Sequence, residues 1–188
     1  MALGCSSEPT SAGGYVNIIH SERAAKDAAL RDASEPIPEA LKPTLLPLKY
    51  YAVDERCDIP AAMTPFSGAL PQSMVYSDGA VRKVRRVGTL RFRLNGRALE
   101  LNAFVEVGAS EQDLFVPFGD LTNGTETYPA GRMLDVRRTV TDLYDLDFNK
   151  AYNPSCYYNP AYSCPIPPRE NRLAVAVTAG EHVNPRHP

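Results

Sequence analysis

The chain has 188 residues, of which 44% are hydrophobic, and this is enough for one domain with its own buried core. Its 20 basic and 22 acidic residues give a net charge of −2, which argues against a nucleic-acid partner held by a general positive field. No apolar run approaches the roughly 18 residues that a membrane-spanning helix needs.

Proline and tyrosine are over-represented, and both gather in one part of the chain. Proline makes up 17 of the 188 residues, about 9% where about 5% is usual, and there are 10 tyrosines but no tryptophan. Five tyrosines and five prolines lie between Tyr144 and Pro168. This segment is therefore the most distinctive part of the composition.

Residues 1–20 are small, polar and rich in glycine, which predicts a flexible leader. Within it, Gly4-Cys5-Ser6 resembles the end of a bacterial lipoprotein signal, although no basic region and almost no apolar stretch precede Cys5. This resemblance predicts a lipid anchor at Cys5 as the only membrane contact, and a location on the periplasmic face of the cell envelope. The alternative is a cytoplasmic protein.

A helix is predicted from Ser21 to Asp32, because Ser21 is a suitable N-cap and alanines fill the middle of the segment. The prolines that begin at Pro36 exclude a long continuation of this helix. A first strand is predicted next, at residues 48–53.

The clearest local signal is a hairpin centred on Asn95-Gly96, a pair that favours a two-residue type I′ turn. A two-residue loop fixes the register of the two strands. Phe92 then faces Leu99 on one side of the hairpin, and Arg91 faces Glu100 on the other as a pair of opposite charges.

A second hairpin is predicted around Asp78-Gly79, with Tyr76 opposite Val81 and a β-bulge near Arg85-Arg86. Further strands are predicted at residues 113–117, 132–138, 140–148 and 173–178. Short strands separated by turns indicate a mainly β (β-rich α+β) fold, an antiparallel β-barrel or sandwich with an N-terminal helix and a long Pro/Tyr-rich loop. We expect one β-rich domain over residues 21–183 and a C-terminal tail at residues 184–188.

Four basic residues lie close together after the second turn, and the basic region continues with three arginines: Arg82, Lys83, Arg85 and Arg86, then Arg91, Arg93 and Arg97. They predict either a binding surface for an anionic ligand or lipid head groups, or a solvated strand face. Phe92 is the one aromatic residue of this basic region, too few for the stacking that single-stranded nucleic acid requires.

Two further segments are candidates for a binding site. In the turn-rich loop 123–135, Glu126, Tyr128, Arg132 and Asp135 could orient a polar ligand. Alternatively, Arg132 could pair with Glu126 or Asp135 and merely order the loop. The segment 147–172 is long and irregular, and such segments are often functional when they are ordered. It could equally be a lid that closes one end of the barrel.

The cysteines and the lack of familiar motifs bear on whether the protein forms a disulfide, binds a metal or catalyses a reaction. Cys156 and Cys164 have seven residues between them and could form a disulfide in an oxidising compartment, whereas their spacing does not suit a zinc knuckle. The sequence has no familiar nucleophile, nucleotide or metal motif, and no histidine lies between His20 and His182. We therefore predict no cofactor and no metal site, and an enzyme is not favoured.

Four stretches of the sequence are distinctive: RVGTLRFRLNGRALEL, DLFVPFGDLTNGTETYPAGRMLDV, LDFNKAYNPSCYYNPAYSCPIPPRENRL and the closing Val177-Thr178-Ala179-Gly180-Glu181. Together they resemble the bacterial and archaeal family called domain of unknown function 1684. With weaker matches the resemblance spans about Glu22 to Val183, and it departs from the family at His182 and Cys57, where lysine and tyrosine are expected. The resemblance implies a β-rich fold and an uncharacterised function, and it supplies no catalytic residue.

The leading hypothesis is a small-ligand-binding domain of the bacterial cell envelope, with its pocket under the Pro/Tyr-rich loop. Two alternatives are a hydrolase-like enzyme with Glu126, Asp147 or Glu170 as general base, and a structural or assembly factor. The candidate ligand-binding residues are Glu126, Tyr128, Arg132, Asp135, Asp147, Asn149, Tyr152, Asn153, Tyr158, Glu170 and Asn171.

Overall fold

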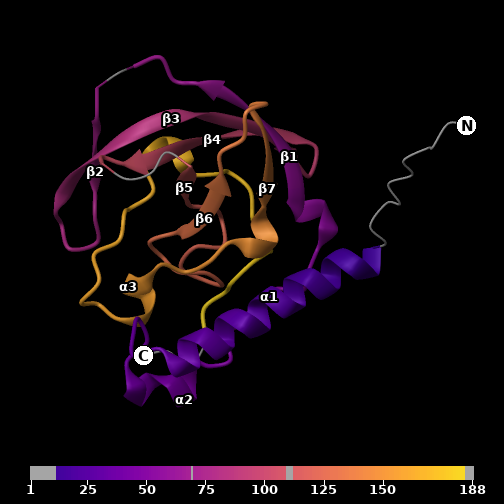
Figure 1. Ribbon diagram of the computed structural model, residues 1–188, viewed down its shortest axis with the longest axis vertical. Coiled ribbons are helices and arrows are strands. Elements are labelled where there is room, and N and C mark those ends of the chain that lie inside the picture. The colour runs from indigo at the N-terminus through magenta and orange to yellow at the C-terminus, as the bar shows by residue number, and fades with distance from the viewer. Residues whose placement is uncertain (1–11, 69, 109–111, 185–188) are drawn as a thin grey trace, which may run out of the picture.

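The computed structural model describes residues 12–68, 70–108 and 112–184. Within them the strands are β1 (Asp58–Pro65), β2 (Gln72–Val75), β3 (Val81–Leu94), β4 (Arg97–Glu106), β5 (Asp113–Phe118), β6 (Arg132–Arg137) and β7 (Leu143–Asp147). They form one antiparallel sheet in the order β6-β5-β4-β3-β1-β7, with β2 paired to β3 outside this path. The two end strands, β6 and β7, contact each other, so the sheet is a nearly closed barrel (Figure 1).

The predicted hairpin is confirmed as β3 and β4. Phe92 pairs with Leu99 and Arg91 with Glu100, and the register shifts between Arg86 and Gly88, next to the predicted bulge. The shift bends β3, which lets its two halves pair with different strands. Its first half pairs with β2, its second half pairs with β1, and β4 pairs along both.

The second hairpin exists, but its predicted register is wrong by one residue. Val75, not Tyr76, lies opposite Val81. The reason is that the Tyr76 amide donates to the Ala80 carbonyl, which makes the connecting loop longer than the sequence suggested.

The main core fills the interior of the barrel. Three aromatic rings meet near its centre, with Phe148 5.7 Å from Phe92 and 5.4 Å from Phe118 between ring centroids. Fully burying a side chain of this size stabilises the fold by about 1.5–3 kcal/mol. We call residues 173–181 the C-terminal segment. Its first part adds alternate residues to this core, since Leu173, Val175 and Val177 are buried and the residues between them are exposed.

Two predicted strands, residues 48–53 and 173–178, are not strands in the structure. The alternation in the second one was correct, but its backbone makes only scattered hydrogen bonds, such as the Leu173 amide to the Gly119 carbonyl at 2.7 Å. Residues 48–53 contribute a single bridge between Tyr50 and Glu181. Both segments are extended chains held by side chains and irregular contacts.

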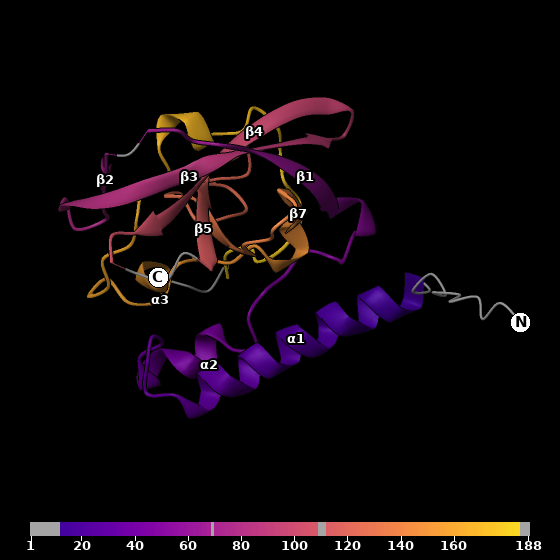
Figure 2. The ribbon, with the colours of Figure 1, turned by 45° about the horizontal axis from the view of Figure 1, so that its top comes forward.

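The helix α1 spans Ala12–Asp32 and lies outside the barrel (Figures 1 and 2). The predicted helix is confirmed, but its start is nine residues earlier, so residues 12–20 are not a flexible leader. Tyr15 and Ile19, one turn apart, face the domain; Tyr15 donates to Asp147 at 2.8 Å and Ile19 is buried. Residues 1–11, with Cys5, lie outside the described residues. None of the described helices is both long and apolar enough to span a membrane.

A second, smaller core forms beside α1. The short helices α2 (Lys42–Leu45) and α3 (Ser155–Tyr158) face each other there, and Ile37, Leu45 and Leu48 pack against Tyr157 and Tyr158. The remaining helical turns are the 3-10 turns η1 (Glu39–Leu41), η2 (Glu55–Cys57), η3 (Phe148–Lys150) and η4 (Arg169–Asn171). Part of the Pro/Tyr-rich segment thus packs on this second core and not on the core inside the barrel.

Gly180 offers a test of how tightly the C-terminal segment packs. Its φ is +76°, and a Cβ there would lie 2.5 Å from the Ala151 carbonyl oxygen. We expect Gly180→Ala to lower the free energy of unfolding by clearly more than the roughly 1–2 kcal/mol that left-handed backbone costs alone. Gly124 has a φ of +82°, and a Cβ added there would meet no described atom within 4 Å, so Gly124→Ala is the matched control. Equal losses in urea unfolding would contradict this packing.

Candidate functional site

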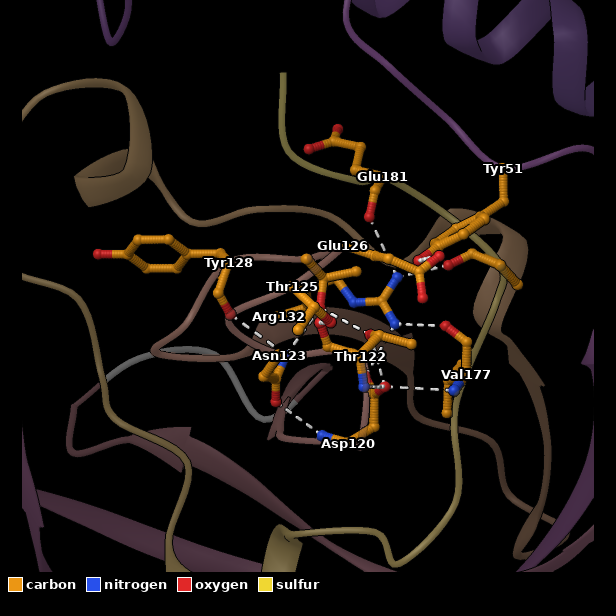
Figure 3. Close-up of polar contacts among 12 residues, drawn as sticks. Tyr51, Asp120, Thr122, Asn123, Thr125, Glu126, Tyr128, Arg132, Val177 and Glu181 are labelled. Atoms are coloured by element: carbon orange, nitrogen blue, oxygen red, sulfur yellow. Dashed lines mark hydrogen bonds and ion pairs between the residues drawn. The ribbon is translucent and has the colours of Figure 1, made fainter. Parts of the chain in front are cut away.

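Arg132, at the start of β6, is completely buried and is bound by the protein itself (Figure 3). Its Nη2 donates to Asp120 Oδ2 at 2.9 Å and to the Val177 carbonyl at 2.7 Å. Its Nη1 donates to the carbonyls of Ala179 and, at 3.1 Å, Glu181. The guanidinium therefore supplies the hydrogen bonds that a neighbouring strand would otherwise give to the C-terminal segment.

The partner carboxylate belongs to a loop that is tied to itself. Asp120 Oδ1 accepts from the amide and the hydroxyl of Thr122 at 2.8 and 2.6 Å. Asn123 accepts from the Asp120 amide at 2.7 Å and donates to Thr127 at 2.8 Å and to the Tyr128 carbonyl at 3.2 Å. These contacts hold Asp120 in place for Arg132, so the loop is ordered by its own polar groups (Figure 3).

Glu181 is a second buried charge, and it joins three parts of the chain. Its carboxylate accepts from Lys26 of α1 at 2.6 Å, from the Asn153 amide at 2.8 Å and from the Tyr158 hydroxyl at 2.9 Å. Burial and this carboxylate raise the pKa of Tyr158. The contact fixes α1 and the Pro/Tyr-rich segment against the C-terminal segment.

Asn149 and Asp147 hold the N-terminal helix and the segment before β1. Asn149 is buried; it accepts from the Asp54 amide at 3.0 Å and donates to the Asp54 carbonyl at 2.8 Å and to Tyr15 at 3.0 Å. Asp147 accepts from the Asn149 amide at 2.9 Å, which closes the 3-10 turn η3. Both side chains are thus engaged in structural contacts.

Asn171 fills a gap in the sheet. Strands β4 and β5 pair at Phe104 and Phe115, and beyond this point their backbones separate. The Asn171 amide group bridges the opening: it accepts from the Asn102 amide at 2.8 Å and donates to the carbonyls of Asn102 at 2.9 Å and Pro117 at 2.7 Å. A buried amide that replaces missing ladder bonds in this way keeps the barrel wall closed.

Two carboxylates from the predicted set are exposed and contact a single tyrosine each. Glu126 accepts from Tyr51 at 3.2 Å, and burial together with this carboxylate raises the pKa of Tyr51 to about 12. Asp135 accepts from Tyr152 at 2.9 and 3.0 Å. Asp135 also lines a cavity of about 380 Å³, and Asp147 from the predicted set lies on the wall of the same cavity.

The predicted pocket residues therefore do not surround one cavity. Five of the candidate ligand-binding residues are buried and contact other parts of the protein: Arg132, Asn149, Asn153, Tyr158 and Asn171. The prediction that Arg132 orders its loop through an ion pair was right in kind, but the partner is Asp120 and not Glu126 or Asp135.

The two cysteines of the Pro/Tyr-rich segment lie together as free thiols, without the predicted disulfide. The Cys156 amide donates to Cys164 Sγ at 3.0 Å, which places the Cys164 sulfur against the backbone of Cys156. Cys156 and Tyr128 line a cavity of about 570 Å³ beside α3. In residues 12–68, 70–108 and 112–184, no group of three acidic, histidine or cysteine side chains could hold a metal ion.

A separate cavity, of about 460 Å³, opens where β2, β3 and β4 meet the segment 166–170. Met74, Val84 and Phe104 form an apolar part of its wall. Arg86 of β3 and Glu170 of η4 add charged groups. Glu170 is the one carboxylate of the predicted site that lies here, so we call this space the Arg86 cavity.

Arg86 is held in place by its neighbours, but no described carboxylate forms an ion pair with it. Its guanidinium donates to the Thr89 hydroxyl and stacks over the Phe66 ring, 4.7 Å from the ring centroid. Thr89 in turn donates to Asn102 at 3.1 Å. The Arg86 Nε atom is buried without a hydrogen-bond partner, and no described carboxylate lies within ion-pair distance. A fixed, unpaired guanidinium in a partly apolar cavity can bind an anion.

The basic run in the sequence indicated the charge of this cavity but not its shape. The basic run that includes Arg86 predicted an anionic ligand as one of two interpretations. The apolar wall was missed, because Met74, Val84 and Phe104 come from three strands whose contacts depend on the bulge in β3.

The fold and the site define the class of protein: a nearly closed antiparallel barrel with an N-terminal helix, in which buried polar side chains such as Arg132, Asn149 and Asn171 contact other parts of the protein. The family model described as "Protein of unknown function (DUF1684)" matches residues 45–182, and the chain belongs to this family. It is similar to the solution NMR structure of an uncharacterized protein of Haloarcula marismortui, with a TM-score of 0.73 and 33% sequence identity. The match covers 93% of this chain and 97% of the other. No curated protein matches the chain.

The structural role of Arg132 predicts a large loss on its removal. Arg132→Met leaves Asp120 buried without its cation, and we expect the free energy of unfolding to fall by about 3–5 kcal/mol. Arg91→Met, which breaks the exposed pair with Glu100, is the control and should cost only about 0–1 kcal/mol. Urea unfolding measures both. Similar small losses in the two variants would contradict the structural role.

Proposed function

We propose that this protein binds a small molecule with an anionic group and an apolar body, and that the Arg86 cavity is the binding site. The observation that carries the proposal is the Arg86 guanidinium on the cavity wall, which has no described carboxylate within ion-pair distance. Such a group is costly to hold partly buried, and an anionic ligand would supply the missing partner.

The surroundings of Arg86 support this choice of ligand. Thr89 and Phe66 restrict the guanidinium to one position, so less side-chain entropy is lost on binding. The apolar wall next to it suits a hydrocarbon or aromatic group, and a volume of about 460 Å³ lies within the usual range for small-molecule sites. Glu170 on the same wall would favour a ligand with a donor group away from its anion.

The location of the protein is part of the proposal. A lipid anchor at Cys5 would place the domain at the cell envelope, with α1 between the anchor and the barrel. The supporting observation is the sequence Gly4-Cys5-Ser6 alone. Mass spectrometry of the protein purified from cell membranes would find acylated Cys5 if the proposal is right, and an unmodified, water-soluble chain if the alternative is right.

The binding proposal can be tested with matched probes by NMR titration. We expect benzoate and phenyl phosphate to shift the amide signals of Phe104 and Ile166, and benzamide, which has the same shape without the charge, to bind far more weakly. Arg86→Met should weaken binding of the anions by about 10- to 100-fold, since a hydrogen bond to a charged group contributes roughly 1.5–3 kcal/mol.

Arg93→Met is the control variant, because Arg93 lies on the exposed part of the same strand and contacts the Gly96 carbonyl. It should leave the affinities unchanged. Equal binding of benzamide and benzoate, or shifts that map to another face of the barrel, would contradict the proposed site.

A further inference from the structure

Cys156 and Cys164 form a pair of thiols at a place that the proposed ligand site does not use. Cys156 lies in the first turn of α3, and its amide donates to Cys164 Sγ at 3.0 Å. Cys156 is half-buried, Cys164 is buried, and both thiols are free.

The buried member is held rigidly. The Cys164 amide donates to the Ser77 hydroxyl at 3.0 Å, and the Ser77 amide donates to the Cys164 carbonyl at 2.8 Å. The next residue, Pro165, forms a bridge with Tyr76. Cys164 is therefore fixed against the turn between β2 and β3, with its sulfur directed at Cys156.

The half-buried member is accessible and activated. Cys156 lines the cavity of about 570 Å³ together with Tyr128, and we call this space the Tyr128 cavity. The Tyr128 hydroxyl lies 4.0 Å from Cys156 Sγ. Hydrogen bonds from Cys164, Ser77 and Tyr128 outweigh burial and lower the pKa of Cys156 to about 6. The same contact with Cys156 raises the pKa of Cys164, which keeps its proton. Cys156 is thus the nucleophile of the pair.

We propose that Cys156 and Cys164 form a reversible thiol–disulfide exchange site, in which Cys156 attacks small disulfides that enter the Tyr128 cavity and Cys164 completes the exchange. The proposal is independent of the ligand bound in the Arg86 cavity. It assigns the protein a redox-active site, with a small organic disulfide as its oxidising substrate.

The reaction balances in two steps. The Cys156 thiolate attacks one sulfur of the disulfide RSSR; a bond forms between Cys156 Sγ and that sulfur, the S–S bond breaks, and RS⁻ leaves. As the Cys164 sulfur attacks Cys156 Sγ, its proton passes to the leaving thiolate, which forms the internal disulfide and releases the second half of the probe as RSH. The protein loses two electrons and two protons, and RSSR becomes two RSH.

The first test uses oxidised glutathione as the probe and a full-length chain in which Cys5→Ser and Cys57→Ser leave only this pair. At pH 7 we expect an intact mass lower by two hydrogen atoms and a peptide that links Cys156 to Cys164. With Cys164→Ser added, the mixed disulfide between Cys156 and glutathione should accumulate. With Cys156→Ser added, adduct formation should slow by about tenfold or more, since Cys164 is buried and holds its proton.

Two controls separate this chemistry from damage to the fold. Amide NMR spectra of the serine variants should match the parent, because serine is nearly the size of cysteine. A chain that keeps only Cys57, whose pKa is raised by burial to about 11, should react with the probe about tenfold more slowly than Cys156, or slower still. Equal rates for the Cys156→Ser variant and the parent, or no internal disulfide in the parent, would overturn the proposal.

Discussion

The fold depends on the buried contact between Arg132 and the C-terminal segment. The carbonyls of Val177, Ala179 and Glu181 belong to an extended chain that lies in the core without a strand beside it. Buried carbonyls need donors, and the guanidinium supplies them while Asp120 balances its charge. Arg132 thus lets an irregular segment complete a barrel whose end strands, β6 and β7, are not paired with each other in the sheet.

This arrangement explains why the buried polar residues of the predicted site and the proposed ligand site are separate. Glu181 and Asn171 act like Arg132: each satisfies backbone or hydroxyl groups where the regular sheet ends. Their donors and acceptors are used within the protein, so little is left for a ligand. Arg86 differs, because its charge has no described carboxylate as a partner and its guanidinium stands at an open cavity. We therefore propose ligand binding at the basic run of β3 and thiol chemistry at Cys156 in α3.

Local signals in the sequence predicted the parts of the fold that local physics decides. The Asn95-Gly96 turn fixed the register of β3 and β4, and the alternation of Leu173 and Val175 indicated the buried face of the last segment. The start of α1 was not predictable in the same way, because Tyr15 and Ile19 are held by contacts with distant residues such as Asp147.

The candidate site was harder to predict for the same reason. Arg132 and Asp120 are 12 residues apart, and nothing in their spacing shows that three carbonyls more than 40 residues later complete the contact. Native-state hydrogen exchange tests most directly whether the Arg132 contact makes the C-terminal segment part of the cooperatively folded barrel. The amides of Leu173, Val177 and Glu181 should exchange as slowly as that of Leu101 in β4, by global unfolding. Fast exchange of these three amides by local opening, with β4 still protected, would contradict it.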